Sequence, residues 1–92
     1  MKYEVIFQDV VWRDLEDIPA NIRRRILGAI ERRLTTHPAQ YGLKLRQALS
    51  DLWKIRVGDY RVVYEMSKGR VVVWAVLNRR DVYPEVKRRW LQ

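Results

Sequence analysis

Hydrophobic and polar residues alternate at the start of the chain and then change to a helical spacing. Within residues 2–8 apolar side chains alternate with polar ones, which predicts a strand with one buried face. Asp9 follows and is expected to cap a short helix. The apolar side of this helix carries four residues: Val11, Trp12, Leu15 and Ile18.

A second helix is predicted from Pro19, which suits a first helical turn, to His37-Pro38, which ends it. Its apolar stripe consists of Ile22, Ile26, Leu27, Ile30 and Leu34. The remaining surface carries five arginines: Arg23, Arg24, Arg25, Arg32 and Arg33. Such a face either binds phosphates or is simply solvated, and solvation is the more common outcome.

The stretch from residue 52 to residue 83 contains three β-branched and aromatic runs separated by Gly58-Asp59 and Lys68-Gly69. This pattern is typical of two consecutive β-hairpins. A loop at residues 41–46, which leads into a short strand or edge segment, precedes them, and a C-terminal helix is predicted to start at Pro84. The order predicts an α+β fold in one domain, residues 1–92. A small antiparallel-rich sheet, made of the N-terminal strand and the C-terminal meander, packs against two N-terminal helices and a short C-terminal helix.

The register of the first hairpin sorts its side chains onto two faces. A two-residue turn at Gly58-Asp59 opposes Arg56 to Arg61, and directly opposed residues share a face. The core face then holds Trp53, Ile55, Val57, Tyr60, Val62 and Tyr64. Lys54, Arg56 and Arg61 share the opposite face.

The second hairpin is expected to pair Arg61 with Val76 and to bring residues 78–80 toward the same end of the sheet. Opposed arginines repel each other, although flexible side chains can relieve this repulsion by extending into water. Convergence of four or five cations favours an anion-binding site over a solvated surface.

Composition narrows the classes of partner. The chain has 19 Lys and Arg against 11 Asp and Glu, a net charge of +8 and a pI near 10.3. A positive surface of this kind attracts nucleic acid, an acidic protein or an anionic membrane. No segment is long or apolar enough to cross a bilayer and no signal segment is apparent, while the absence of cysteine fits a cytoplasmic protein.

The candidate chemistry depends on Lys, Arg and Tyr. His37 is the only histidine and is interpreted as a helix-ending residue rather than a metal ligand, so no metal or other cofactor is expected. RNA cleavage by attack of the 2′-hydroxyl on its phosphate needs a base, cations around the phosphorane and an acid. A lysine among arginines loses its proton more easily than an isolated one, and a tyrosine can stack on a splayed base.

Three segments resemble the RelE/ParE toxin superfamily: Lys44-Leu45-Arg46, residues 52–65 and residues 78–83. The resemblance implies a toxin neutralised by an acidic or amphipathic antitoxin. RelE-type members cut mRNA in the ribosomal A site without a metal. The site residues that the resemblance implies are the basic pair Lys54 and Arg56, the transition-state arginine Arg61, the acid Arg79 with Arg80 as the alternative, and the stacking tyrosine Tyr83. Arg80, Lys44 and Arg46 are expected to contact RNA.

Two positions depart from the superfamily pattern. Gln47 and Asp51 stand where glycine is often found, and both lie outside the proposed site.

Three functions remain open: a ribosome-dependent mRNA endonuclease, a ParE-like inhibitor of DNA gyrase without nuclease activity, and a module that only binds. The complete set of basic residues together with Tyr83 favours the endonuclease.

Overall fold

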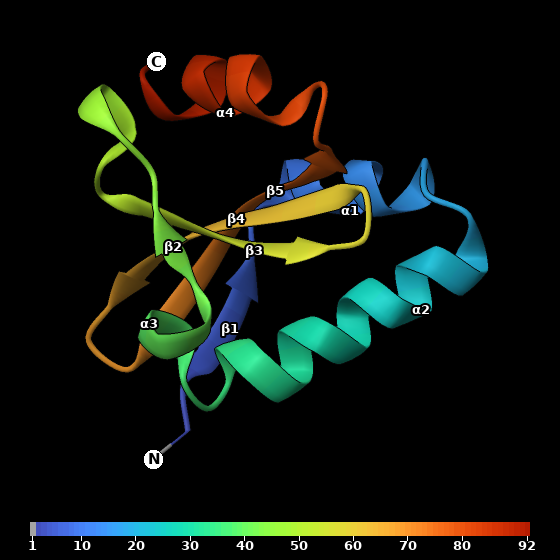
Figure 1. Ribbon diagram of the computed structural model, residues 1–92, viewed down its shortest axis with the longest axis horizontal. Coiled ribbons are helices and arrows are strands. Elements are labelled where there is room, and N and C mark those ends of the chain that lie inside the picture. Colours follow the sequence, from blue (N-terminus) through green and yellow to red (C-terminus); the bar gives the residue numbers. More distant parts are fainter. Residues whose placement is uncertain (1) are drawn as a thin grey trace.

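The computed structural model describes residues 2–92 and contains a five-stranded sheet (Figure 1). Its strands are β1 (Glu4–Phe7), β2 (Leu43–Lys44), β3 (Leu52–Val57), β4 (Tyr60–Ser67) and β5 (Arg70–Asn78). Their order across the sheet is β1-β5-β4-β3-β2, with β1 parallel to β5 and all other neighbours antiparallel. The predicted α+β class, with an N-terminal strand joined to a C-terminal meander, is confirmed.

The helices are α1 (Asp9–Glu16), α2 (Ala20–Ala29), α3 (Pro38–Tyr41) and α4 (Val82–Trp90). Helix α2 continues as a π-helical turn at Ile30–Leu34, and a 3-10 turn lies at Gln47–Leu49. Three predicted boundaries were wrong by one or two residues. Asp9 is the first residue of α1 rather than its cap, and Pro19 precedes α2. Pro84 is the third residue of α4, which is allowed because the first helical turn needs no N–H donor from that position.

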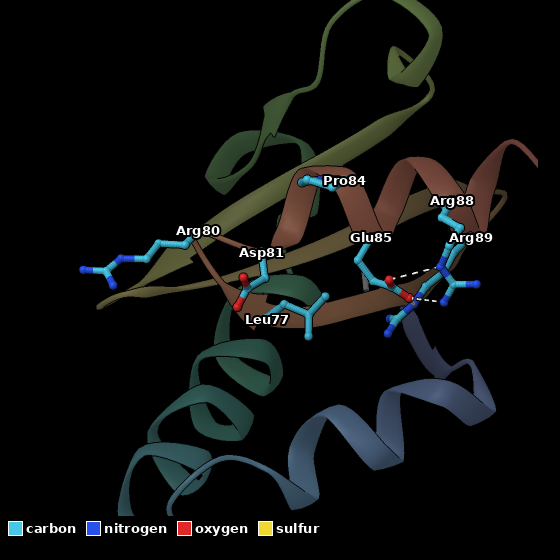
Figure 2. A pocket seen from close by; sticks show the side chains of 7 residues that line it. All are labelled: Leu77, Arg80, Asp81, Pro84, Glu85, Arg88 and Arg89. Atoms are coloured by element: carbon cyan, nitrogen blue, oxygen red, sulfur yellow. Dashed lines mark hydrogen bonds and ion pairs between the residues drawn. The ribbon is translucent and has the colours of Figure 1, made fainter.

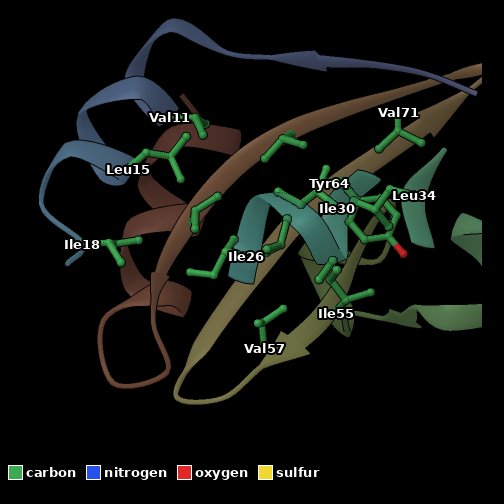
Figure 3. Close-up of a cluster of buried hydrophobic side chains, with 14 residues drawn as sticks. Val11, Leu15, Ile18, Ile26, Ile30, Leu34, Ile55, Val57, Tyr64 and Val71 are labelled. Atoms are coloured by element: carbon green, nitrogen blue, oxygen red, sulfur yellow. The ribbon is translucent and has the colours of Figure 1, made fainter. Parts of the chain in front are cut away.

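The main core lies between the sheet and helices α1 and α2 (Figure 3). Its fully buried members include Val11, Ile26, Leu34, Val62 and Tyr64. The predicted stripe of α1 was wrong in one respect, because Trp12 is 52% exposed. The indole stacks on Phe7 with ring centroids 5.0 Å apart and therefore covers the edge of the core from outside.

A β-bulge in β5 gives the sheet a second core. Tyr64 pairs with Val73 but Val63 pairs with Ala75, so Trp74 is left over. The predicted pairing of Arg61 with Val76 is therefore wrong, and Arg61 pairs with Leu77. Beyond the bulge the side chains change face, and α4 covers a second apolar cluster of Leu45, Leu52, Val63, Ala75, Val82 and Val86. The face that carries Lys54 is thus partly covered by α4 rather than open to solvent.

The edge of β5 beyond the end of β1 is closed by an ion pair. The backbone N–H of Val76 donates a 3.0 Å hydrogen bond to Oδ2 of Asp14, on α1. Arg89, on α4, donates to both oxygens of Asp14 at 2.9 Å and to the carbonyl oxygen of Trp74 at 2.9 Å. Asp14 is 6% exposed, and the hydrogen bond to it raises the pKa of Arg89. The helices on the two faces of the sheet are thereby joined around its edge.

Candidate functional site

The centre of the candidate site is a contact between β3 and α4. The Lys54 ammonium donates a 2.7 Å hydrogen bond to the hydroxyl of Tyr83, and its Nζ lies 5.1 Å from the centroid of the Tyr83 ring. Tyr83 is the second residue of α4, between Val82 and the other α4 residue of the second cluster, Val86, so the packing of this helix on the sheet brings the tyrosine to Lys54. Both residues were predicted to belong to one site, and the structure brings them together.

A cavity of about 420 Å³ lies beside this contact. It is lined by Lys44, Leu45, Arg46, Leu49, Lys54 and Tyr83. Lys44 belongs to β2, which pairs with β3 through Trp53 and Lys54, and its Nζ lies 5.7 Å from the centroid of the Trp53 ring. The two residues expected to contact RNA at this position, Lys44 and Arg46, thus line the same cavity as Lys54 and Tyr83.

A second cavity of about 380 Å³ shares Lys54 with the first. It is lined by Arg33, Tyr41, Leu43, Lys54, Ile55, Arg56 and Arg61. Arg56 and Arg61 oppose each other across β3 and β4, as predicted from the Gly58-Asp59 turn. Arg61 donates hydrogen bonds to the carbonyl oxygens of Gly58, at 3.1 Å, and Tyr60, at 2.9 Å, which hold its guanidinium against the turn. Three of the predicted catalytic cations, Lys54, Arg56 and Arg61, therefore line this second cavity, and Lys54 also lines the first.

Arg79 and Arg80 take different directions after β5. The backbone N–H of Arg79 donates a 2.8 Å hydrogen bond to the carbonyl oxygen of Asp59, which ties it to the turn between β3 and β4. Both arginines are exposed, and neither lines the two cavities around Lys54. Arg80 lines a third hollow beside α4, and Figure 2 shows its side chain extending away from Asp81 and Glu85.

This third hollow, of about 500 Å³, has mixed charge. Arg88 and Arg89 both donate hydrogen bonds to Glu85 (Figure 2). The bond from Arg88 is the main cause that lowers the pKa of Glu85, burial opposes it, and the bond from Arg89 adds to it. Because these arginines are already paired with carboxylates, this hollow attracts an anion less than the cavities around Lys54 do.

Two charged or aromatic residues that line the cavities were not predicted as site residues, Arg33 and Tyr41. Arg33 was one of five arginines on the second helix for which phosphate binding and solvation were both left open, and Tyr41 was assigned to a loop without a role. Helical phase does not single out Arg33, because Arg23 is half-buried as well, while Arg24, Arg25 and Arg32 are exposed. Tyr41 gave no signal in the sequence, since its position depends on α3.

Residues 2–92 contain neither a candidate metal site nor a membrane-spanning helix. No group of three or more His, Cys, Asp and Glu side chains in this range lies close enough together to hold a metal ion. None of the helices formed by these residues is long and apolar enough to cross a membrane.

Comparison with known proteins identifies the class to which the fold and the basic cavities belong. The profile of the ParE toxins of type II toxin–antitoxin systems, parDE, matches residues 5–83. The chain therefore belongs to this family, within the RelE/ParE toxin superfamily. Toxin RelG of Mycobacterium tuberculosis is 31% identical over 85 residues, which cover 90% of this chain and 98% of RelG. Toxin RelE3 of Methanocaldococcus jannaschii is 28% identical over 83 residues, covering 87% and 94% of the two chains.

Solved structures agree with this assignment. A chain in the RelBE2 toxin–antitoxin complex of Mycobacterium tuberculosis superposes with a TM-score of 0.81 at 28% identity, covering 86% of this chain and 100% of that one. A mutant of Escherichia coli toxin RelE in the free state gives a TM-score of 0.77 at 22% identity, covering 99% and 96%, which shows the shared fold. The resemblance seen in the sequence is thus confirmed at the level of family and fold.

Proposed function

We propose that this chain is a RelE-like toxin that cleaves mRNA in the ribosomal A site by metal-independent attack of the 2′-hydroxyl. The observation that carries this proposal is the 2.7 Å contact between Lys54 Nζ and the Tyr83 hydroxyl at the junction of two cavities lined by cations. Residues 1–92 form one toxin domain in this proposal, and curated relatives of almost the same length carry the names RelE, RelG and RelE3.

The reaction forms a 2′,3′-cyclic phosphate and releases the 5′-oxygen of the next nucleotide. Lys54 is the proposed base that takes the proton of the 2′-hydroxyl. Arg56 and Arg61 donate hydrogen bonds to the charged phosphorane oxygens, and these bonds strengthen as the charge develops. Tyr83 stacks on the splayed base while its hydroxyl holds the Lys54 amine in place.

Arg79 is the proposed acid that protonates the leaving 5′-oxygen. The backbone hydrogen bond to Asp59 keeps Arg79 at the end of the sheet that carries Arg56 and Arg61. Arg80 lines the hollow beside Glu85, but its side chain extends away from Asp81 and Glu85 (Figure 2), which supports an RNA-contacting role for it. Lys44 and Arg46 contact the RNA backbone from the first cavity.

The proposed partners are the message in the A site and a cognate antitoxin with an acidic or amphipathic helix. The structural relatives from Mycobacterium tuberculosis and Methanococcus jannaschii are toxin–antitoxin complexes, RelBE2 and RelB-RelE. The net charge of +8 supports an acidic partner, because an antitoxin that covers the two cavities must compensate their arginines.

The test measures cleavage of A-site mRNA on programmed ribosomes by the purified protein. We expect cleavage by the parent, and a loss of about 100-fold or more in kcat for Arg61→Ala because transition-state stabilisation is removed. Arg70→Ala is the matched control, since Arg70 lies at the other end of β5 in an exposed ion pair with Glu4. The proposal is contradicted if the parent leaves the message intact under conditions where a known RelE cuts it. The role of Arg61 is contradicted if Arg61→Ala cleaves at the same rate as the parent.

A second candidate is inhibition of DNA gyrase by a protein without nuclease activity. The observation that favours it is the match to the ParE family over residues 5–83. Gyrase-trapped DNA breaks on expression, together with uncut A-site message, identify this function. The presence of Lys54, Arg61 and Tyr83 in the lining of two adjoining cavities supports the nuclease instead.

A further inference from the structure

The cavity that contains Arg56 and Arg61 lies where the edge of β3 is uncovered. The edge strand β2 pairs only with Trp53 and Lys54, so the part of β3 beyond Lys54 has no neighbouring strand on that side. Arg33, in the π-helical turn after α2, reaches this edge and donates a 3.3 Å hydrogen bond to the carbonyl oxygen of Arg56. A side chain from the helical layer is thereby placed next to two of the proposed catalytic cations.

The same cavity is also lined by an exposed aromatic ring, that of Tyr41. Tyr41 is 54% exposed, yet the guanidinium carbon of Arg33 lies 5.9 Å from the centroid of its ring. The His37 ring contacts it edge-on, with centroids 6.3 Å apart. Tyr41 ends α3, which is attached to the main core by a 2.6 Å hydrogen bond from the Tyr64 hydroxyl to the carbonyl oxygen of Pro38. An oriented and accessible ring of this kind is suited to stacking against a flat ligand.

The cations of this cavity have no carboxylate partners. Within the part of the chain that the structure describes, Arg33, Arg56 and Arg61 form no ion pair, whereas Arg70, Arg88 and Arg89 do. Guanidinium groups bind phosphate through paired hydrogen bonds, and unpaired guanidinium groups beside one exposed ring complement a nucleotide. The ring favours RNA over an acidic peptide as the occupant, because an acidic peptide needs only the charge.

We propose that Arg33 and Tyr41 bind a second nucleotide of the RNA, adjacent to the nucleotide held by Lys54 and Tyr83. Tyr41 stacks on its base, and Arg33 contacts its phosphate. Lys54 lines both cavities, so a single strand passes from one to the other across the end of β2. This inference rests on the proposed function and adds a positioning subsite to it.

The subsite is tested with RNA that cannot be cut. Dissociation constants are measured by NMR titration for a dinucleotide and for the two trinucleotides that extend it at the 5′ or the 3′ end, all with 2′-O-methyl riboses. We expect one of the two extensions to tighten binding by about tenfold, the effect of stacking one base on an aromatic ring. Tyr41→Leu should abolish this gain and Tyr41→Phe should keep it.

The arginine is tested by a matched pair of variants on one helical segment. Arg33→Gln should weaken binding of the extended trinucleotide by about fivefold, while Arg25→Gln, which removes the same charge from an exposed position, should change it by less than about twofold. The proposal is overturned if neither extension tightens binding, or if Tyr41→Leu keeps the gain. Equal effects of Arg33→Gln and Arg25→Gln also overturn it, because they indicate attraction by net charge alone.

A parallel cleavage assay separates this inference from the proposed function. On programmed ribosomes, Tyr41→Leu should raise KM more than it lowers kcat, because the subsite holds the strand without touching the scissile phosphate. A parent that binds the longer RNA but leaves A-site message intact retains the subsite and loses the nuclease proposal. A parent that cleaves A-site message but gains no affinity from either extension retains the nuclease proposal and loses the subsite.

Discussion

The hydroxyl of Tyr64 occupies the space that a side chain on Gly42 would need. A Cβ built on Gly42 would lie 1.9 Å from Tyr64 Oη and 2.9 Å from the carbonyl oxygen of Pro38. This close approach lets the segment between α3 and β2 pass over the main core while the Tyr64 hydroxyl bonds to Pro38. One fully buried tyrosine thus fixes the segment that presents Tyr41 and Lys44 to the two cavities.

Gly42→Ala should therefore lower the free energy of unfolding by about 3 kcal/mol, because Tyr64 must move and its hydroxyl loses its buried partner. Gly28→Ala is the control, since its Cβ meets only the flexible end of Arg32 and alanine is favoured in a helix, so stability should rise by about 0.5 kcal/mol. Urea unfolding followed by circular dichroism measures both. Equal effects of the two substitutions would contradict the packing of Tyr64 against Gly42.

Tyr64 should also make stability depend on alkaline pH. Burial raises the pKa of Tyr64 above its ordinary value of 10.0. An acid whose pKa is raised by folding gives its full contribution below the pKa of the unfolded chain and loses it as the pH rises toward the folded pKa. Tyr64→Phe should cost about 1 kcal/mol at pH 7 through the lost hydrogen bond, and this difference should shrink above about pH 10. Unfolding free energies of parent and variant between pH 7 and 11 provide the comparison, and a difference that stays constant refutes the prediction.

The ion pair between Asp14 and Arg89 should be one of the stronger polar contacts. The two side chains are only 6% and 10% exposed, so removal of one partner leaves a buried charge. Arg89→Met is expected to cost about 3 kcal/mol. Arg88→Met removes a neighbouring arginine whose side chain is 63% exposed, and it should cost less than about 0.5 kcal/mol. In the double variant Asp14→Asn/Arg89→Met, the loss of unfolding free energy should be smaller than the sum of the losses in the two single variants. Additive losses, measured by thermal or urea unfolding, would argue against the ion pair.

Gln47 offers a stabilising substitution. Its φ of +56° lies in the left-handed region, where glycine is free of the steric penalty that other residues meet. Gln47→Gly should raise stability by about 0.5–1 kcal/mol, whereas Gln40→Gly, in helix α3, should lower it by a similar amount. Unchanged or reduced stability of Gln47→Gly would show that the left-handed conformation is not strained.

Tyr83 should contribute through both its ring and its hydroxyl. Tyr83→Phe keeps the ring but removes the acceptor of the 2.7 Å hydrogen bond from Lys54, so kcat should fall by about tenfold with little change in KM. Tyr83→Ala removes the stacking surface as well and should also raise KM by about tenfold. Kinetics on programmed ribosomes separate the two effects. Equal kinetics of Tyr83→Phe and the parent would leave the hydroxyl without a role.

The sequence predicted those parts of the fold that depend on local signals. The Gly58-Asp59 turn sets the pairing of Arg56 with Arg61, and the glycine at position 58 adopts the positive φ of 59° that such a turn requires. The pairing of the second hairpin failed only beyond Trp74. The run of apolar residues through β5 lacks the alternation that would reveal a bulge, because both of its faces are buried.

The candidate site was predictable where the residues follow from register and resemblance. Lys54, Lys44, Arg46 and Tyr83 were expected and line one cavity. Arg33 and Tyr41 could not be expected, because their proximity depends on how α3 and the end of α2 pack over the edge of β3. The pair of Asp14 and Arg89 likewise joins residues 75 positions apart, and no local pattern marks such a contact.

The order of these contacts along the chain has a consequence for synthesis. A ribosome releases Asp14 and all five strands before it releases Tyr83 and Arg89. A nascent chain exposed only as far as Asn78 has the material of the whole sheet but lacks the ring that accompanies Lys54 and the arginine that fastens α4 to α1. Tyr83 therefore joins the candidate site, and Arg89 fastens α4 to α1, only after the residues of the sheet have been released.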